Sequence, residues 1–203
     1  MNRKNLRSLA AGVALLVAVG ALAGCGGEKK ADDSKKMVTV GIAQLVEHGA
    51  LDAANKGFVA GMASKGFKEN ENVKYDRQNA QADQSNLQNI AQRFVSNKVD
   101  LICAIATPTA QTMANATKDI PIVATAVTDY EVAKLAASNN EPKGNVTGTS
   151  DMNPIDQQLE LLLKIAPQTK NIGTVYSSSE VNSQLQVDVL KKLAGDKGIN
   201  VIE

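Results

Sequence analysis

Three consecutive serines, Ser177, Ser178 and Ser179, lie between an apolar, strand-like run and a helix-like run. Hydroxyl groups in that position can attack a substrate, cap the following helix or bind an anion. Attack requires an activating base, but the sequence contains a single histidine, His48, and no G-x-S-x-G motif around any serine. A hydrolase that pairs Ser178 with His48 is therefore a minor hypothesis. Two interpretations stay open, a helix cap at Ser177 and an anion-binding site at Ser178 and Ser179.

Small polar residues follow most of the other strand-like runs as well. Thr107-Pro108 and Asn153-Pro154 have the form of a capping residue followed by proline at the first helical position. Ser177-x-x-Glu180 and Thr128-x-x-Glu131 fit the capping box. Such residues either satisfy the N–H groups of their own helix or leave those groups to an anion such as a carboxylate. Ligands bind beyond the carboxyl ends of parallel strands. The candidates at these ends are the three serines, Gln44, Thr107, Thr109, Thr128, Asp129, Ser150 and Asp151.

The elements that would position these side chains alternate between strand-like and helix-like periods from residue 37 onward. Near-continuous apolar strands that alternate with helices are typical of a parallel sheet covered on both faces. We predict an α/β fold with two doubly wound parallel-sheet lobes, the second of them incomplete. The predicted strands are 37–43, 71–80, 100–106, 120–127, 146–150, 171–177 and 199–203, and the predicted helices are 49–67, 83–99, 109–117, 130–137, 154–165 and 180–195.

The N-terminal residues have the features of a lipoprotein signal peptide. A basic head precedes an apolar stretch that is short for a bilayer span, and "LAGC" closes the segment. We predict that residues 1–24 are removed and that Cys25 carries a diacylglyceryl group. Residues 25–36 are glycine-rich and charged, which is typical of a flexible tether. We expect a lipoprotein anchored in the membrane of the cell envelope and facing the extracytoplasmic side.

A stretch rich in turn-forming residues, 138–148, divides the rest of the chain. We predict a first lobe over 37–145, which is long enough for a domain core. The second lobe would cover 146–203 and end on a strand with no covering helix after it. Missing strands would leave sheet edges unpaired. We therefore expect either part of a longer product or a truncated lipoprotein that binds no ligand.

Composition argues against several classes of protein. Of 22 basic and 21 acidic residues, the signal holds three basic ones, so the remaining chain has a net charge of −2. Nucleic-acid binding needs a basic face, so we expect no such partner. A single histidine and the lack of HExxH and G-x-x-x-x-G-K-S/T motifs argue against a zinc enzyme or a nucleotide site. We expect no enzyme, cofactor or metal. Cys103 has apolar neighbours and is predicted to be buried.

Five segments carry a more specific signal. They are "GIAQLVEHGALDA", "AIATPTAQTMANATKDIPIV", "AVTDY", "GNVTGTSDMNP" and "IGTVYSSSEVNSQ". Together they resemble the solute-binding lipoproteins of ABC importers, in particular the branch that binds tryptophan, tyrosine or phenylalanine. The resemblance covers nearly all of 37–203 and implies a periplasmic-binding-protein-like fold whose two lobes close on a ligand. It also implies an ABC permease as partner and a small, aromatic amino acid as ligand.

Matched residue by residue, the resemblance implies a ligand site with side chains from both lobes. Serine hydroxyls and helix N–H groups would bind the carboxylate of an amino acid, and Asp129 or Asp151 would bind its ammonium group. Family members usually have proline where this chain has Tyr130, whose ring either stacks on a ligand or covers a helix start. The implied residues are Gln44, Thr107, Thr109, Thr128 and Asp129 on the first lobe, and Ser150, Asp151, Ser177, Ser178, Ser179 and Asn182 on the second.

Overall fold

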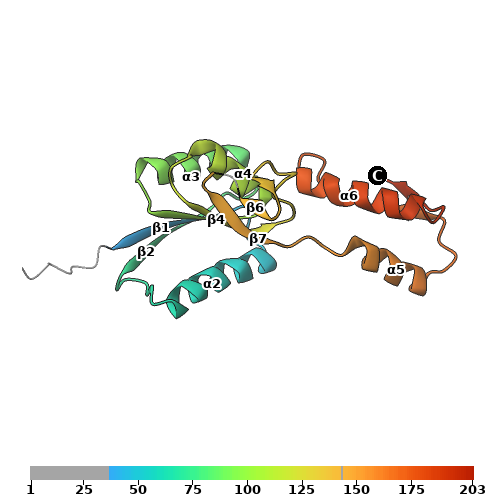
Figure 1. Ribbon diagram of the computed structural model, residues 1–203, viewed down its shortest axis with the longest axis horizontal. Helices are drawn as coiled ribbons and strands as arrows, with labels where there is room; N and C mark the ends of the chain where they lie inside the picture. Colours follow the sequence, from blue (N-terminus) through green and yellow to red (C-terminus); the bar gives the residue numbers. More distant parts are fainter. Residues whose placement is uncertain (1–36, 143) are drawn as a thin grey trace, which may run out of the picture. The chain divides into compact units, whose positions relative to one another are not determined.

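The computed structural model describes residues 37–142 and 144–203 (Figure 1). The predicted signal peptide, the lipidation site Cys25 and the tether lie outside the described residues. Within the described ranges, no helix is long and apolar enough to cross a membrane.

Five parallel strands form the main sheet, in the order β2-β1-β3-β4-β7. Apolar residues dominate the central strands because helices cover both faces of the sheet. The register pairs Val40 of β1 with Tyr75 of β2 on one side and with Leu101 of β3 on the other. The strands are β1 (Val38–Gln44), β2 (Val73–Asn79), β3 (Leu101–Ile105), β4 (Ile122–Val127) and β7 (Val146–Ser150).

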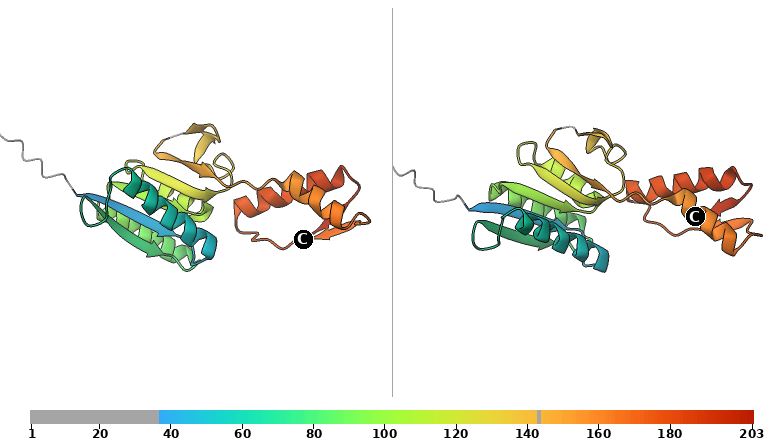
Figure 2. Two further views of the ribbon diagram at one scale, coloured as in Figure 1. Left: turned by 90° about the horizontal axis from the view of Figure 1, so that it is seen from below. Right: turned by 60° about the horizontal axis from the view of Figure 1, so that its bottom comes forward.

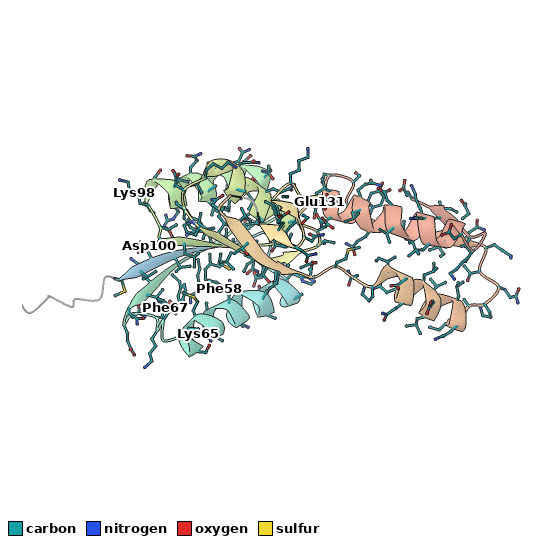
Figure 3. All side chains as sticks on the ribbon, in the orientation of Figure 1. Phe58, Lys65, Phe67, Lys98, Asp100 and Glu131 are labelled. Atoms are coloured by element: carbon teal, nitrogen blue, oxygen red, sulfur yellow. The ribbon has the colours of Figure 1, made fainter. Side chains whose placement is uncertain are left out.

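Helix α2 (Gly49–Ser64) covers one face of this sheet, while α3 (Gln84–Ser96) and α4 (Thr107–Ala116) cover the other (Figures 1 and 2). Consecutive residues of β3 show why both faces are apolar. Ile102 and Ala104 pack in a core with α3 and α4, whereas Cys103 and Ile105 pack in a second core under α2. Phe58 of α2 packs against that second core (Figure 3).

The chain beyond residue 154 forms a smaller unit with its own core. Helices α5 (Ile155–Ile165) and α6 (Val181–Gly195) pack with the parallel pair β8 (Asn171–Gly173) and β9 (Asn200–Ile202). These elements confirm the predicted helices and the last predicted strand. The strand predicted over 171–177 ends early, at Gly173, and Val175 just beyond it is fully exposed. The residues of its buried core cluster are Leu159, Ile172, Ala194 and Ile199.

The helix predicted over 130–137 is wrong. The backbone makes a short turn in which the N–H groups of Leu135 and Ala136 both donate to the carbonyl oxygen of Tyr130. Lys134 has φ = 60°, a left-handed conformation that a helix does not continue. The chain then enters a hairpin of two short antiparallel strands that the sequence did not reveal, β5 (Ala136–Ser138) and β6 (Glu141–Pro142).

The strand predicted at 146–150, which we expected at the start of the second lobe, belongs to the first sheet. It forms β7, which pairs in parallel with β4 through Ile122 opposite Val146 and Ala124 opposite Gly148. The register shifts between Ala124 and Val127, where Ala126 has φ = 55°. The turn-rich stretch before β7 therefore connects two neighbouring strands of one sheet, β4 and β7.

Candidate ligand-binding site

Helices leave the carboxyl edge of the sheet in opposite directions at β1 and β3. Strand β1 lies between β2 and β3. The helix after β1, α2, lies on one face, and the helix after β3, α4, lies on the other (Figure 1). A crevice at such a switch point is where open α/β sheets bind their ligands. Gln44 ends β1 and Thr107 follows β3, so two of the predicted site residues lie at this point.

Thr107 and Thr109 have hydroxyl groups without partners at the start of α4. Their side chains are 2% and 0% exposed, and neither Oγ1 atom makes a hydrogen bond. The predicted cap at Thr107 is wrong, because the helix already begins there and Ala106 is its N-cap, with φ = 88° and no side-chain bond. An unpaired buried hydroxyl costs about 1–3 kcal/mol. The positive end of α4 and two unpaired hydroxyls therefore form a site suited to a polar, negatively charged group.

Gln44 is buried but is committed to protein partners. Its Nε2 donates to the Val46 carbonyl oxygen at 2.9 Å and to Asp52 Oδ1 at 2.6 Å, and its Oε1 accepts from Asn55 Nδ2 at 3.1 Å. These bonds hold the first turns of α2 against the end of β1. Asp52 and Asn55 were missed in the sequence, although their spacing of three residues places both on one face of a helix. A polar pocket of about 400 Å³ lies beside this network.

Asp129 uses both carboxylate oxygens within the first lobe. Oδ1 accepts from the N–H of Val132, and Oδ2 accepts from Asn139 Nδ2, each at 2.8 Å. The pattern Thr128-x-x-Glu131 does not cap a helix, because only a turn follows. Asp129 holds that turn against the β5–β6 hairpin. Its role as the partner of a ligand ammonium group stays a prediction.

Ser150 and Asp151 lie where the chain leaves the first sheet. Ser150 Oγ donates to the Thr128 carbonyl oxygen at 2.7 Å and accepts from the N–H of Met152 at 3.1 Å. The N–H of Asp151 donates to the Val127 carbonyl oxygen at 3.1 Å. The carboxylate of Asp151 is exposed and makes no hydrogen bond or ion pair with another described residue. Of the two candidate aspartates, Asp151 is thus the one whose carboxylate is uncommitted.

The three serines form an exposed turn before α6. The predicted capping box is wrong, because α6 begins at Val181 and its N-cap is Glu180, without a side-chain bond. Ser177 Oγ instead lies 3.2 Å from Ser179 Oγ, and the Ser177 carbonyl oxygen accepts from the N–H of Glu180. The hydroxyls are therefore not used to satisfy the helix end.

Asn182, in the first turn of α6, has a buried oxygen without a partner. Its Nδ2 donates to Glu180 Oε2 at 3.2 Å, whereas Oδ1 is buried and unbonded. Asn153 was predicted to cap α5, the helix that follows it. It does not do so, because the N-cap of α5 is Pro154. The Asn153 side chain donates to Gln186 Oε1 at 2.9 Å instead. Gln186 was missed in the sequence, although it lies four residues after Asn182 on the same helix face.

Tyr130 is a core residue of the first lobe. Its ring is 6% exposed, and its hydroxyl donates to the Ala124 carbonyl oxygen at 2.9 Å, with the Thr149 carbonyl oxygen 3.2 Å away. Burial raises the pKa of this hydroxyl to about 12. Of the two interpretations left open, stacking on a ligand is therefore disfavoured, and the ring fills the space where β4 and β7 meet.

His48 caps α2. Its Nδ1 accepts from the N–H of Ala50 at 3.3 Å, and the side chain is exposed. Nδ1, the nitrogen that the acid of a Ser-His-Asp triad would hold, is thus engaged with the backbone. In the described part of the chain, no three His, Cys, Asp or Glu residues are grouped in a way that could hold a metal ion.

Cys103 is completely buried in β3, and burial raises the pKa of its thiol to about 12. An unfolded thiol has a pKa of about 8.5, so the folded state favours the protonated form. This contribution to stability is complete below about pH 8.5 and is lost as the pH rises toward 12.

We expect iodoacetamide at about pH 8 to spare Cys103 in the native chain and to modify it in concentrated urea. Mass spectrometry of the Cys103 peptide measures this, and equal labelling in both states would contradict it.

Comparison with known proteins identifies the family. A family model described as "ABC transporter substrate binding protein" matches residues 39–203. The chain belongs to this family. Membership confirms the resemblance that the five sequence segments indicated. The family is one of extracytoplasmic binding proteins, which agrees with the expectation that the chain is not an enzyme.

Several family members are close in sequence and structure. A tyrosine-binding protein of Clostridioides difficile (strain R20291) is 48% identical over 210 residues, which cover 100% of this chain and 60% of the relative. A conserved domain protein from Vibrio cholerae is 43% identical with a TM-score of 0.80, over 83% of this chain and 57% of that chain. An ABC domain from Streptococcus pneumonia in complex with L-Trp is 43% identical with a TM-score of 0.78, over 82% and 56%. The chain spans less than two thirds of the length of each.

Proposed function

We propose that the chain captures an aromatic amino acid for an ABC permease, as the lipid-anchored binding component of an importer. One observation carries this proposal, the pair of unpaired hydroxyls of Thr107 and Thr109 at the start of α4. A carboxylate accepts hydrogen bonds from hydroxyl and N–H groups and is favoured by the positive end of a helix. A ligand carboxylate at this point would supply the partners that the protein lacks.

An amino acid also carries an ammonium group, which needs an acceptor. We assign this role to Asp151, since its carboxylate is uncommitted whereas both oxygens of Asp129 already bind protein groups. Asn182 Oδ1 is a second unbonded acceptor, on α6. Ser178 and Ser179 are exposed donors in front of that helix, and we keep them as candidates for contact with the ligand.

The relatives support an aromatic ligand. One is named a tyrosine-binding protein, and another was solved in complex with L-Trp. The match to the tyrosine-binding protein covers the whole chain and so includes Thr107 and Thr109. The lobe boundaries belong to the proposal as well: we propose a first lobe over 37–150, a crossover at 151–154 and a second lobe from 155 onward, preceded by a lipid-bearing Cys25 and a tether.

Isothermal titration of the full chain with L-tyrosine, L-tryptophan and L-phenylalanine tests the proposal. We expect binding of at least one of them, and no binding of tyramine, which lacks the carboxylate. Phenylpropionate, which lacks the ammonium group, should bind far more weakly than phenylalanine because Asp151 would have no partner. A folded chain that gives no heat with any of the twenty amino acids would refute the ligand class and favour the non-binding lipoprotein.

The anchor is tested separately. We expect the wild-type chain in the membrane fraction of cells and a Cys25→Ser variant in the soluble fraction of the envelope. Equal distribution of both would contradict lipidation at Cys25. This experiment does not depend on the ligand, so its outcome leaves the binding proposal untouched.

A further inference from the structure

The crossover between β7 and α5, residues 151–154, has no regular secondary structure but is fastened at its first residues. Ser150 Oγ donates to the Thr128 carbonyl oxygen at 2.7 Å, and the N–H of Asp151 donates to the Val127 carbonyl oxygen at 3.1 Å. The N–H of Met152 in turn donates to Ser150 Oγ at 3.1 Å. These bonds tie the start of the crossover to the end of β4.

The far end of the crossover is fastened to α6. Asn153 Nδ2 donates to Gln186 Oε1 at 2.9 Å, and Gln186 Nε2 donates to the Asn182 carbonyl oxygen at 3.3 Å. Asn182 Nδ2 donates to Glu180 Oε2 at 3.2 Å. This bond fixes the orientation of the Asn182 amide group, because a carboxylate oxygen accepts from the nitrogen and not from the oxygen. A chain of hydrogen bonds thus leads from the crossover to the main-chain carbonyl of Asn182, the residue whose side-chain Oδ1 is unbonded.

Met152 lies between these two sets of bonds and takes part in the first set only through its N–H. Met152 lies after the residues bonded to β4 and before the residue bonded to α6, and its side chain is 38% exposed. Hinges in proteins are a few loop residues that take up the change in φ and ψ while their neighbours stay fixed. The bonds on either side confine such a change to Met152 and its flanking peptide units.

We propose that Gln186 is a positioning residue, which links ligand contact at Asn182 to the conformation of the crossover at Met152. This inference rests on the proposed function for the identity of the ligand. A ligand N–H group bound to Asn182 Oδ1 restrains the first turn of α6, and Gln186, which is bonded to the main-chain carbonyl of Asn182, transmits that restraint to Asn153. Because linkage is reciprocal, holding the crossover in its bonded conformation also favours ligand binding.

Gln186→Leu tests the link, because leucine keeps most of the side-chain volume and makes neither hydrogen bond. The matched control is Gln184→Leu on the same helix, where the lost bond goes only to Asp188. Backbone hydrogen exchange of the full chain without ligand is followed by mass spectrometry on peptides that cover 151–155. We expect exchange there to rise about fivefold in Gln186→Leu and to stay at the wild-type rate in the control.

Asn153→Ala removes the bond between Asn153 and Gln186 from its exposed side. It is the alternative variant if Gln186→Leu disturbs the fold. It should raise exchange by a similar factor, and the double variant should add nothing beyond either single change. Unchanged exchange in both single variants, or fully additive effects, would overturn the proposal.

A second arm uses L-tyrosine as the probe. In the wild type, saturating L-tyrosine should slow exchange over 151–155, and in Gln186→Leu this protection should disappear while titration still detects binding. Equal protection in wild type and variant would overturn the link. Absence of L-tyrosine binding to the wild type would count against the proposed function alone, because the ligand-free comparison still decides the role of Gln186.

Discussion

Replacing Gly148 by alanine is expected to lower the free energy of unfolding by about 3 kcal/mol, at the upper end for an overpacked site. A Cβ atom at this position would lie 1.9 Å from the Ala124 carbonyl oxygen and 2.2 Å from the Tyr130 hydroxyl. The first of these atoms belongs to the backbone of β4 and cannot rotate away. The variant must therefore separate β7 from β4 at the point where the chain leaves the first sheet.

Equilibrium unfolding in urea measures this effect. Gly61→Ala is the control within the same lobe, because a Cβ there meets nothing within 4 Å and alanine favours the helix by about 0.5–1 kcal/mol. The double variant Gly148→Ala/Tyr130→Phe removes the contact with the hydroxyl and keeps that with the carbonyl. It should stay strongly destabilised. A wild-type midpoint for Gly148→Ala would show that β7 does not approach β4 as closely as described.

Thr107→Val and Thr109→Val are expected to change stability and affinity in opposite directions. Each replaces a buried hydroxyl without a partner by a methyl group of similar size. The ligand-free chain should gain about 1 kcal/mol of stability per substitution, since an unsatisfied polar group is removed. Affinity for an aromatic amino acid should fall by about 2 kcal/mol, or about thirtyfold, since a hydrogen bond to a charged carboxylate is lost.

Thr112→Val on the same helix is the matched control. Its hydroxyl is already paired, as it donates to the Pro108 carbonyl oxygen at 2.9 Å and lies 3.1 Å from Gln84 Nε2. This variant should lose about 1 kcal/mol of stability and keep its affinity. Urea unfolding and titration with L-tyrosine and L-tryptophan give the two quantities. Loss of stability in the Thr107 and Thr109 variants, with affinity unchanged, would mean that these hydroxyls have partners within the protein.

Much of the fold was predictable because its signals are local. Hydrophobic periodicity located the strands of the main sheet and helices α2, α3 and α4 to within a few residues, and it also located α5, α6 and β9. The errors arose where local signals competed. The capping pattern Thr128-x-x-Glu131 suggested a helix. In the structure, the Tyr130 carbonyl oxygen accepts hydrogen bonds from two N–H groups, and Lys134 has a left-handed backbone conformation. The turn-forming residues at 138–148 suggested a linker between lobes, but part of that stretch forms the β5–β6 hairpin.

The sequence predicted the sheet edge where the candidate site lies, but not which of its side chains are free to bind a ligand. Parallel strands end at one edge of a sheet, so the residues after β1, β3 and β4 had to lie near one another. Which of them are available for a ligand depends on hydrogen bonds that the order of residues does not show. Gln44 bonds to Asp52 of α2 and Asp129 bonds to Asn139, whereas the hydroxyl groups of Thr107 and Thr109 make no hydrogen bond.

The sequence by itself determined the alternation of strands and helices, the family, and the edge of the sheet where a ligand would bind. Each of these follows from the period of apolar residues or from short motifs. Only the tertiary structure decided which hydroxyls and carboxylates are already paired. Ser150 meets Thr128 across 22 residues, and Tyr130 meets Thr149 across 19. Of the three serines before α6, Ser177 was predicted to cap the helix, but the helix starts later, at Val181, with Glu180 as its N-cap.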